Sequence, residues 1–247
     1  MIEALAGASG ELAAVIEDLV VANRILAMHG VLDAFGHVSI RHPRDPDRFL
    51  LARSMAPESV TADDLMLFDL DSNPSAGDTR KAYLERHIHG TLYKARRDIT
   101  AVVHSHSPSV IPFAASSVSL RPIYHMGSFL GKGAPVFDIR RQFGCTDMLI
   151  RDNDQGRALA RTLGNGPVSL MRGHGFITVG NAIAVAVYRA IYTEVNASLQ
   201  HKAITLGGDV TYLEADEAEA ADASIMSVLE RPWTLWRQKA LRQMGSA

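Results

Sequence analysis

The stretch Ile99-Thr100-Ala101-Val102-Val103-His104-Ser105-His106 decides which fold the chain can adopt. Its β-branched residues and its two-residue period predict a strand. Ser107-Pro108 ends that strand at once, because serine is a good helix cap and proline suits the first turn of a helix. We therefore predict an apolar strand that carries two histidines where it ends.

Short strands and helices alternate along the rest of the chain. Apolar or alternating runs bounded by turn residues predict strands over residues 35–41, 49–52, 65–70, 136–139, 168–171 and 176–179. Helical spacing of apolar residues predicts helices over residues 11–29, 81–96, 154–163 and 181–206, with two more near the C-terminus. This alternation indicates one α/β domain over residues 1–247, with a helical tail over about residues 214–247 and helices on both faces of a sheet.

Composition narrows the class of protein. A chain of 247 residues, 47% of them apolar, can build one sizeable core. The 25 basic and 27 acidic side chains nearly balance, which argues against a nucleic-acid partner held by bulk charge. No apolar segment approaches the roughly 20 residues that cross a bilayer, and we find no signal peptide. Cys145 is the single cysteine and cannot form an internal disulfide, so we expect a cytoplasmic protein without a membrane partner.

The two histidines at the end of the predicted strand have the spacing of metal ligands. Residues i and i+2 of a strand point to the same face, so His104 and His106 project side by side. Two imidazoles placed in this way can share one ion at the metal–nitrogen distance of about 2.0–2.1 Å found for zinc. The alternative is a pair of histidines that only hydrogen-bond locally. The position at a strand end favours the metal.

We expect the third ligand to be His174. Gly173 and Gly175 flank it between two apolar strands, and glycines permit unusual backbone angles and close approach. The alternative is a tight hairpin with an incidental histidine. Three neutral histidines leave open positions on an ion, which is the layout of a catalytic site where a metal polarises a substrate oxygen.

Glu85 lies on the polar side of a predicted helix that precedes the histidine pair. A carboxylate near a metal can be a ligand or an acid/base group, whereas an ordinary helical Glu would pair with Lys81 or His89. His87 and His89 point about 200° apart on that helix, so they cannot both face one site. His37 is either a substrate-binding residue or an ordinary loop histidine.

The order of these pieces resembles the class II aldolase/adducin family over residues 22–208. The motifs that carry the resemblance are Gly36-His37-Val38-Ser39, Arg53-Ser54-Met55-Ala56-Pro57, Glu85, His104-Ser105-His106 and Gly173-His174-Gly175. The resemblance implies a three-layer α/β/α fold around a mixed, mostly antiparallel sheet of about nine strands. It also implies one divalent metal ion per subunit, Mn²⁺ or Zn²⁺, and a homotetramer with the site near a subunit interface.

Three stretches of the chain depart from the sugar-phosphate aldolases of that family. His37 stands in place of an asparagine, Met55 in place of a glycine, and Ala82-Tyr83 in place of a pair of serines. In those enzymes the replaced groups form the phosphate pocket. The resemblance therefore disfavours a phosphorylated sugar as the substrate.

Five segments are similar to the decarboxylase branch of the family, whose members act on dihydroxyphthalate, on a hydroxymethylpyridine dicarboxylate and on carboxylated muconic semialdehydes. They are Glu85-Arg86-His87-Ile88-His89, His104-Ser105-His106-Ser107-Pro108, Arg121-Pro122-Ile123-Tyr124-His125-Met126, Met171-Arg172-Gly173-His174-Gly175 and Tyr192-Thr193-Glu194-Val195-Asn196-Ala197. This similarity implies a lyase, a metal-dependent non-oxidative decarboxylase of a small hydroxylated aromatic acid or a hydroxy/keto unsaturated acid. An aldolase that cleaves a non-phosphorylated hydroxy-keto acid is the alternative with the same fold. A non-catalytic, adducin-like binding protein is the alternative from another class.

The expected reaction assigns roles to further residues. Loss of CO₂ leaves negative charge that must be protonated, and Glu85 is our first choice for this transfer, with His87 as the alternative. The expected substrate-binding residues are His37, Ser39, Arg53, Ser54, Arg172 and Tyr192. The arginines would grip a second carboxylate in bidentate pairs, unless they are ordinary surface residues, and the serines would donate hydrogen bonds. Tyr192 and His125 are weaker candidates, because a tyrosine on the long helix can equally pack in the core or at an interface.

Overall fold

A seven-stranded sheet lies at the centre of the computed structural model, which describes residues 10–245. The strands follow the order β3-β2-β1-β4-β7-β6-β5. Their bounds are β1 (His37–Arg41), β2 (Arg48–Ala52), β3 (Leu65–Asp69), β4 (Ala101–Ser105), β5 (Val136–Phe137), β6 (Val168–Met171) and β7 (Gly175–Gly180). Neighbouring strands are antiparallel except for β5 and β6, so the expected mixed, mostly antiparallel sheet is confirmed.

The strand count of about nine was too high, because residues 10–245 form seven strands. Two further segments of the chain each form a β-bridge at a single residue. Arg53 pairs with Ala82, and Phe68 pairs with Pro74, as isolated bridges. Proline has no N–H with which to extend a ladder, so the bridge at Pro74 does not grow into a strand.

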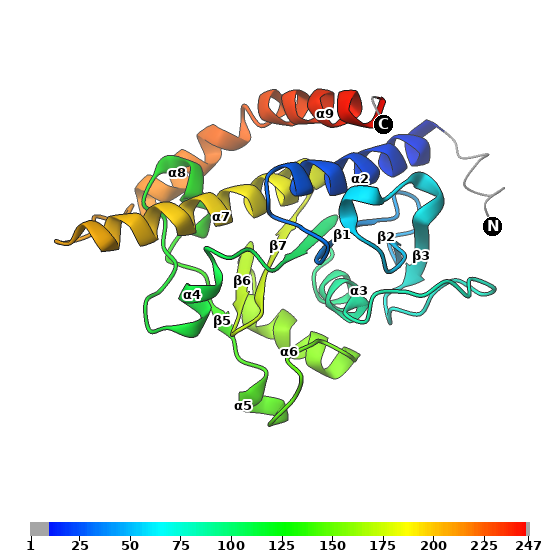
Figure 1. Ribbon diagram of the computed structural model, residues 1–247, viewed down its shortest axis with the longest axis horizontal. Helices are drawn as coiled ribbons and strands as arrows, with labels where there is room; N and C mark the ends of the chain where they lie inside the picture. The colour runs from blue at the N-terminus through cyan, green and yellow to red at the C-terminus, as the bar shows by residue number, and fades with distance from the viewer. Residues whose placement is uncertain (1–9, 246–247) are drawn as a thin grey trace.

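Helices cover both faces of the sheet, as predicted. They are α2 (Gly10–Met28), α3 (Arg86–Ala95), α4 (Ile111–Ala115), α5 (Arg140–Phe143), α6 (Asn153–Leu163), α7 (Ile183–Leu206), α8 (Ala215–Met226) and α9 (Glu230–Gly245). Three short 3₁₀ turns cover Pro57–Ser59, Ala62–Asp64 and His125–Leu130. In Figure 1, α2, α7 and α9 lie on one side of the strands, and α3 and α6 lie on the other. None of the described helices is both long and apolar enough to cross a membrane.

Successive residues of β4 point into the two helical layers. Val103 packs in the cluster that includes α2 and α7, whereas Val102 packs in the cluster that includes α3 and α6. Side chains alternate along a strand, so His104 points to the same side as Val102. The register places His37 of β1 directly opposite His104. Two imidazoles therefore share the α3 side of the sheet at the end of β4.

The helix expected over residues 81–96 begins only at Arg86. The start of the expected helix is extended instead, because Ala82 pairs with Arg53 and the carbonyl oxygen of Lys81 accepts the N–H of Ser54 at 2.7 Å. Glu85 is therefore the residue that precedes the first turn of α3 and not a residue of a helix face.

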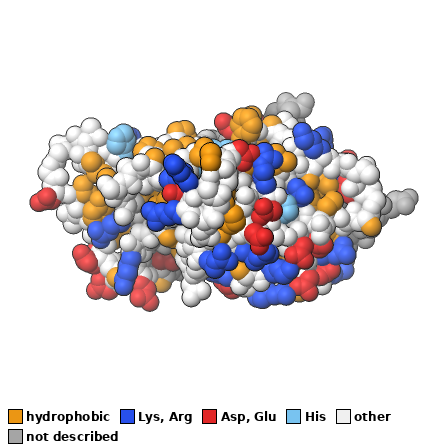
Figure 2. Space-filling view, turned by 90° about the horizontal axis from the view of Figure 1, so that it is seen from below, with side chains coloured by type: hydrophobic (Ala, Val, Ile, Leu, Met, Phe, Trp, Pro, Cys, Tyr) orange, Lys and Arg blue, Asp and Glu red, His pale blue; other side chains and the backbone are white. Residues whose placement is uncertain are grey.

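The surface carries both signs of charge. In Figure 2, acidic and basic side chains are interspersed on the face that is seen from below. This mixture agrees with a formal net charge of −2. On this face, the described residues form no continuous basic field of the kind that attracts a phosphate backbone.

Candidate metal centre

Four side chains converge at the end of β4, namely Glu85, His104, His106 and His174, and their ligand atoms all lie within 4.8 Å of one another. Nε2 of His106 lies 3.0 Å from Nε2 of His104 and 3.0 Å from Nε2 of His174. Oε2 of Glu85 lies 3.4 Å from Nε2 of His104 and 3.3 Å from Nε2 of His174. The structure thus brings the three predicted ligand histidines together with the predicted carboxylate.

Backbone carbonyls fix the tautomers of two of these imidazoles. Nδ1 of His104 donates to the carbonyl oxygen of Phe176 at 3.1 Å, and Nδ1 of His174 donates to that of Met148 at 2.9 Å. A neutral imidazole carries one N–H, so both Nε2 atoms hold lone pairs that face the centre. Such lone pairs repel unless a cation lies between them. Two ligands of a tetrahedral zinc ion lie roughly 3.3 Å apart, so this group fits a divalent metal ion.

A tight hairpin brings His174 to the centre. The residue lies in the turn between β6 and β7, where Gly173 has a φ of +63°, a conformation that favours glycine. A Cβ atom at Gly175 would lie 2.0 Å from the carbonyl oxygen of Ser105. Only glycine therefore lets β7 approach β4 this closely, which is the close approach predicted from the glycines that flank His174.

Glu85 is buried beside the histidines, with 7% of its surface exposed. Its Oε1 atom accepts the backbone N–H of Ile150 at 3.0 Å, while Oε2 faces the imidazoles. Burial by itself would raise the pKa of Glu85, but the charges and hydrogen bonds of His104 and His174 hold that pKa well below its usual range. The group is a carboxylate at neutral pH, able to bind a cation or to accept a proton.

The pKa values of His106 and His174 shift in opposite directions. Burial, together with the nearby His104 and His174, lowers the pKa of His106 to about 4. Burial alone would also lower the pKa of His174, but its hydrogen bond and attraction to Glu85 raise it. His106 is therefore neutral at pH 7 and offers a lone pair to an ion.

The sequence of the chain matches a known family. Residues 17–201 match the model described as Class II Aldolase and Adducin N-terminal domain. The chain belongs to this family. The decarboxylase tropJ of Talaromyces stipitatus is 36% identical over 235 residues, covering 86% of this chain and 88% of that protein. The 3,4-dihydroxyphthalate decarboxylase of Arthrobacter keyseri is 30% identical over 244 residues, covering 92% of each.

Solved structures of the family share the fold. An aldolase II superfamily protein from Pseudomonas syringae superposes with a TM-score of 0.80 at 21% identity, covering 96% of each chain. This likeness confirms the three-layer fold. The matches named decarboxylases confirm the resemblance to that branch of the family and support an enzyme.

His37 lies beside the four-residue group, in agreement with a place in the site. The residue is buried, and its ring centroid lies 5.1 Å from that of His104. Ser39, two residues further along β1, is fully buried and does not face the group. Its hydroxyl contacts Nδ1 of His89 at 2.6 Å and the hydroxyl of Tyr93 at 2.8 Å. Substrate binding by these two residues stays a prediction, and Ser39 has no direct access to the centre.

The two predicted carboxylate-binding arginines already have acidic partners. Nε of Arg53 lies 2.7 Å from Asp64, and Nε of Arg172 lies 2.7 Å from Asp138. Ser54 donates its backbone N–H within the chain and is partly exposed. Neither arginine is held against the four-residue group by a described contact, so their role in binding stays a prediction.

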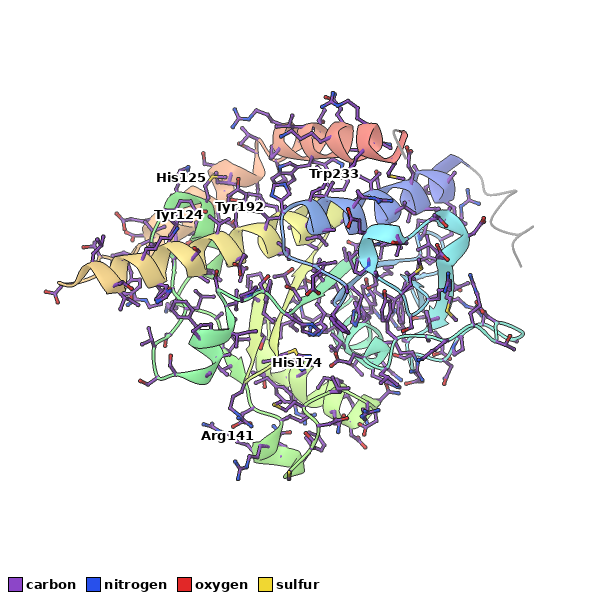
Figure 3. All side chains as sticks on the ribbon, in the orientation of Figure 1. Tyr124, His125, Arg141, His174, Tyr192 and Trp233 are labelled. Atoms are coloured by element: carbon purple, nitrogen blue, oxygen red, sulfur yellow. The ribbon has the colours of Figure 1, made fainter. Side chains whose placement is uncertain are left out.

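Neither His87 nor Tyr192 has a described contact with the four-residue group. Nδ1 of His87 hydrogen-bonds to Oδ1 of Asn153 at 2.9 Å, at the start of α6. Tyr192 packs against Tyr188, with ring centroids 4.6 Å apart. Figure 3 shows Tyr192 near Tyr124 and His125 around α7, well apart from His174.

Apolar and aromatic side chains surround the group. Phe35 is 67% exposed, and its ring centroid lies 6.4 Å from that of His106. Leu84, next to Glu85 in the chain, is also exposed. The ring of Tyr83 lies 4.6 Å from that of His37. An organic ring that reached the centre would meet apolar surface there.

Sequence reasoning missed the position of His89. It was considered as a helical partner of Glu85 and as a residue that could not share a site with His87, but it is completely buried, and its Nε2 atom contacts Nδ1 of His37 at 2.7 Å. Two spacings could have indicated this. Tyr93 follows His89 by one helical turn, and Ser39 follows His37 on the same strand face, so two polar pairs can meet.

Proposed function

We propose that the protein is a metal-dependent, non-oxidative decarboxylase of a small hydroxylated aromatic acid or a hydroxy/keto unsaturated acid. The observation that carries the proposal is the convergence of three imidazole lone pairs and one buried carboxylate at the end of β4. The relatives named as decarboxylases, one of them for 3,4-dihydroxyphthalate, support this reaction class.

His104, His106 and His174 would hold the ion, which we expect to be Mn²⁺ or Zn²⁺, and Glu85 would complete its coordination only until a substrate takes that position. A divalent cation held there would withdraw electron density from a substrate oxygen and stabilise the negative charge that develops when the C–C bond breaks. The donor set of nitrogen and carboxylate oxygen suits such an ion. We expect one ion per subunit.

Glu85 moves the proton in this proposal. Because its pKa is held low, it starts as a carboxylate and takes the proton of the substrate hydroxyl at Oε2. On an aromatic acid Glu85 then gives this proton to the ring carbon that bears the carboxylate, and the electron pair of the C–C bond moves onto the substrate oxygen as CO₂ leaves. Water then restores the proton of the hydroxyl.

The surroundings of the centre would bind the rest of the substrate. Phe35 and Tyr83 offer aromatic surface to a ring or an unsaturated chain. Arg53 and Arg172 are the proposed partners of a second carboxylate, which would compete with Asp64 and Asp138 for them. A substrate with two acidic groups fits this combination best.

Metal analysis of the purified protein, followed by CO₂-release assays on ortho-hydroxy aromatic acids and β-keto acids, tests the proposal. We expect about one divalent ion per subunit and CO₂ from at least one acid. Formation of a carbonyl pair such as pyruvate plus an aldehyde would instead establish the aldolase. A metal-free protein that converts no acid would favour the adducin-like binding protein. Light scattering checks the expected homotetramer.

A further inference from the structure

A chain of four buried polar side chains leads away from the proposed centre into the protein. Nδ1 of His37 contacts Nε2 of His89 at 2.7 Å, and Nδ1 of His89 contacts the hydroxyl of Ser39 at 2.6 Å. That hydroxyl in turn contacts the hydroxyl of Tyr93 at 2.8 Å. The members alternate between β1 and α3, and all of them are buried. Burial of so many polar atoms has a desolvation cost that an apolar contact would avoid.

Tyr93, the member farthest from the proposed centre, determines the direction of these hydrogen bonds. The Tyr93 hydroxyl lies 2.8 Å from Ser39 but 3.4 Å from the carbonyl oxygen of Thr100, which already accepts the N–H of Arg41 at 2.7 Å. The shorter contact favours Tyr93 as the donor to the Ser39 hydroxyl. The Ser39 hydroxyl carries a single proton, which it then donates to Nδ1 of His89.

The direction of these hydrogen bonds also determines the tautomer of His37. A neutral His89 that accepts at Nδ1 carries its proton on Nε2 and donates it to Nδ1 of His37. A neutral His37 then carries its own proton on Nε2. This atom hydrogen-bonds to no residue among 10–245, and the ring lies beside that of His104.

We infer that His89, Ser39 and Tyr93 are positioning residues that fix His37 as a neutral N–H donor toward the substrate and so keep it out of the metal's coordination sphere. The inference rests on the proposed function for the identity of the substrate. A nitrogen ligand needs a lone pair, which His104 and His174 present at Nε2 and His37 does not. An N–H at this place stabilises the oxygen on which negative charge develops.

A double-mutant cycle on kcat tests the inference. Tyr93→Phe removes the donor that sets the chain, and both tautomers of His37 become available, so we expect kcat for CO₂ release to fall about fivefold to tenfold. His37→Asn keeps an N–H donor that has no tautomers. In this background, Tyr93→Phe should lower kcat by less than about twofold. An equal loss in both backgrounds would show that Tyr93 is merely structural and would overturn the inference.

Two further variants check that the effect of Tyr93→Phe is specific. Ser39→Ala interrupts the same chain at another member and should reproduce the effect if Tyr93→Phe does not fold. Tyr188→Phe is the control, because Tyr188 is a buried tyrosine whose hydroxyl donates to the carbonyl oxygen of Met126 at 2.7 Å, outside the chain. It should leave kcat unchanged, and a similar loss there would contradict a specific role for Tyr93.

A spectroscopic measurement separates this inference from the proposed function. Long-range ¹H–¹⁵N spectra of histidine-labelled protein loaded with Zn²⁺ report which nitrogen of each imidazole carries the proton, with His37→Asn identifying the signal. We expect the proton of His37 on Nε2. A proton on Nδ1, or a ring bound to the ion, would overturn the inference even in a protein that releases CO₂. If no acid is decarboxylated, the proposed function fails, while this spectrum still decides the tautomer.

Discussion

The two faces of strand β1 bury different kinds of side chain. On β1, Val38 and Ile40 enter the apolar cluster that includes α2 and α7. The alternate residues His37, Ser39 and Arg41 enter the layer beneath α3, where each meets polar partners. All five residues are buried, so the strand is equally shielded on both sides.

This difference separates stability from chemistry. Apolar burial is non-directional and stabilises the fold roughly in proportion to area. Hydrogen-bonded polar groups fix directions and tautomers, at a desolvation cost that only complete pairing offsets. We therefore expect changes of apolar residues on the α2/α7 side to alter the free energy of unfolding, and changes of the polar residues beneath α3 to alter metal binding and turnover.

The largest effect is expected from His104→Ala. The substitution removes one of the proposed metal ligands, so the bound metal and CO₂ release should disappear together. Metal analysis and a CO₂ assay on the same sample measure this. A metal-free variant with full activity would end the proposed mechanism.

Glu85→Gln should spare more of the site. Three imidazoles remain to hold the ion, but the amide cannot accept the proton, so we expect kcat to fall about 100-fold or more. The metal content should stay near that of the unchanged protein. Turnover that does not change would remove Glu85 from the chemistry.

The α3 side should also be the acid-sensitive side of the metal-free protein. Burial, with the nearby His104, lowers the pKa of His89 from its ordinary value of 6.5 to about 3. Between these values the unfolded chain binds a proton that the folded chain does not, so stability falls as pH drops through this window. At pH 4.5 the loss from this group is about 2–3 kcal/mol relative to pH 7. Urea unfolding at both pH values measures it, and His89→Gln should show a smaller loss; an equal loss would assign the sensitivity elsewhere.

Val103→Ala is the matched change on the opposite face, next to His104 on the same strand. It deletes buried methyl groups from the α2/α7 cluster and should lower the free energy of unfolding by about 2 kcal/mol. We expect metal content and kcat to stay within about twofold of the unchanged protein. A loss of turnover as large as that of Glu85→Gln would show that the two faces are not separable.

Local patterns in the sequence were sufficient for much of the fold and for the three histidines of the group. The two-residue period of β4 places His104 on one face, and the glycines on either side of His174 permit its hairpin. The order of these motifs also identified the family, which the match over residues 17–201 establishes. Such signals are readable because each depends on residues only a few positions apart.

Only the tertiary structure decided what surrounds that group. The N–H of Ile150 orients Glu85 from 65 residues away, and His89 contacts His37 across 52 residues. Arg53 and Arg172 proved to be paired with aspartates, and pairing with Arg53 keeps Ala82 extended ahead of α3. No local period encodes contacts between such distant residues. The sequence by itself therefore determined which residues can bind a metal, while packing between β1, β4 and α3 determined their partners and directions.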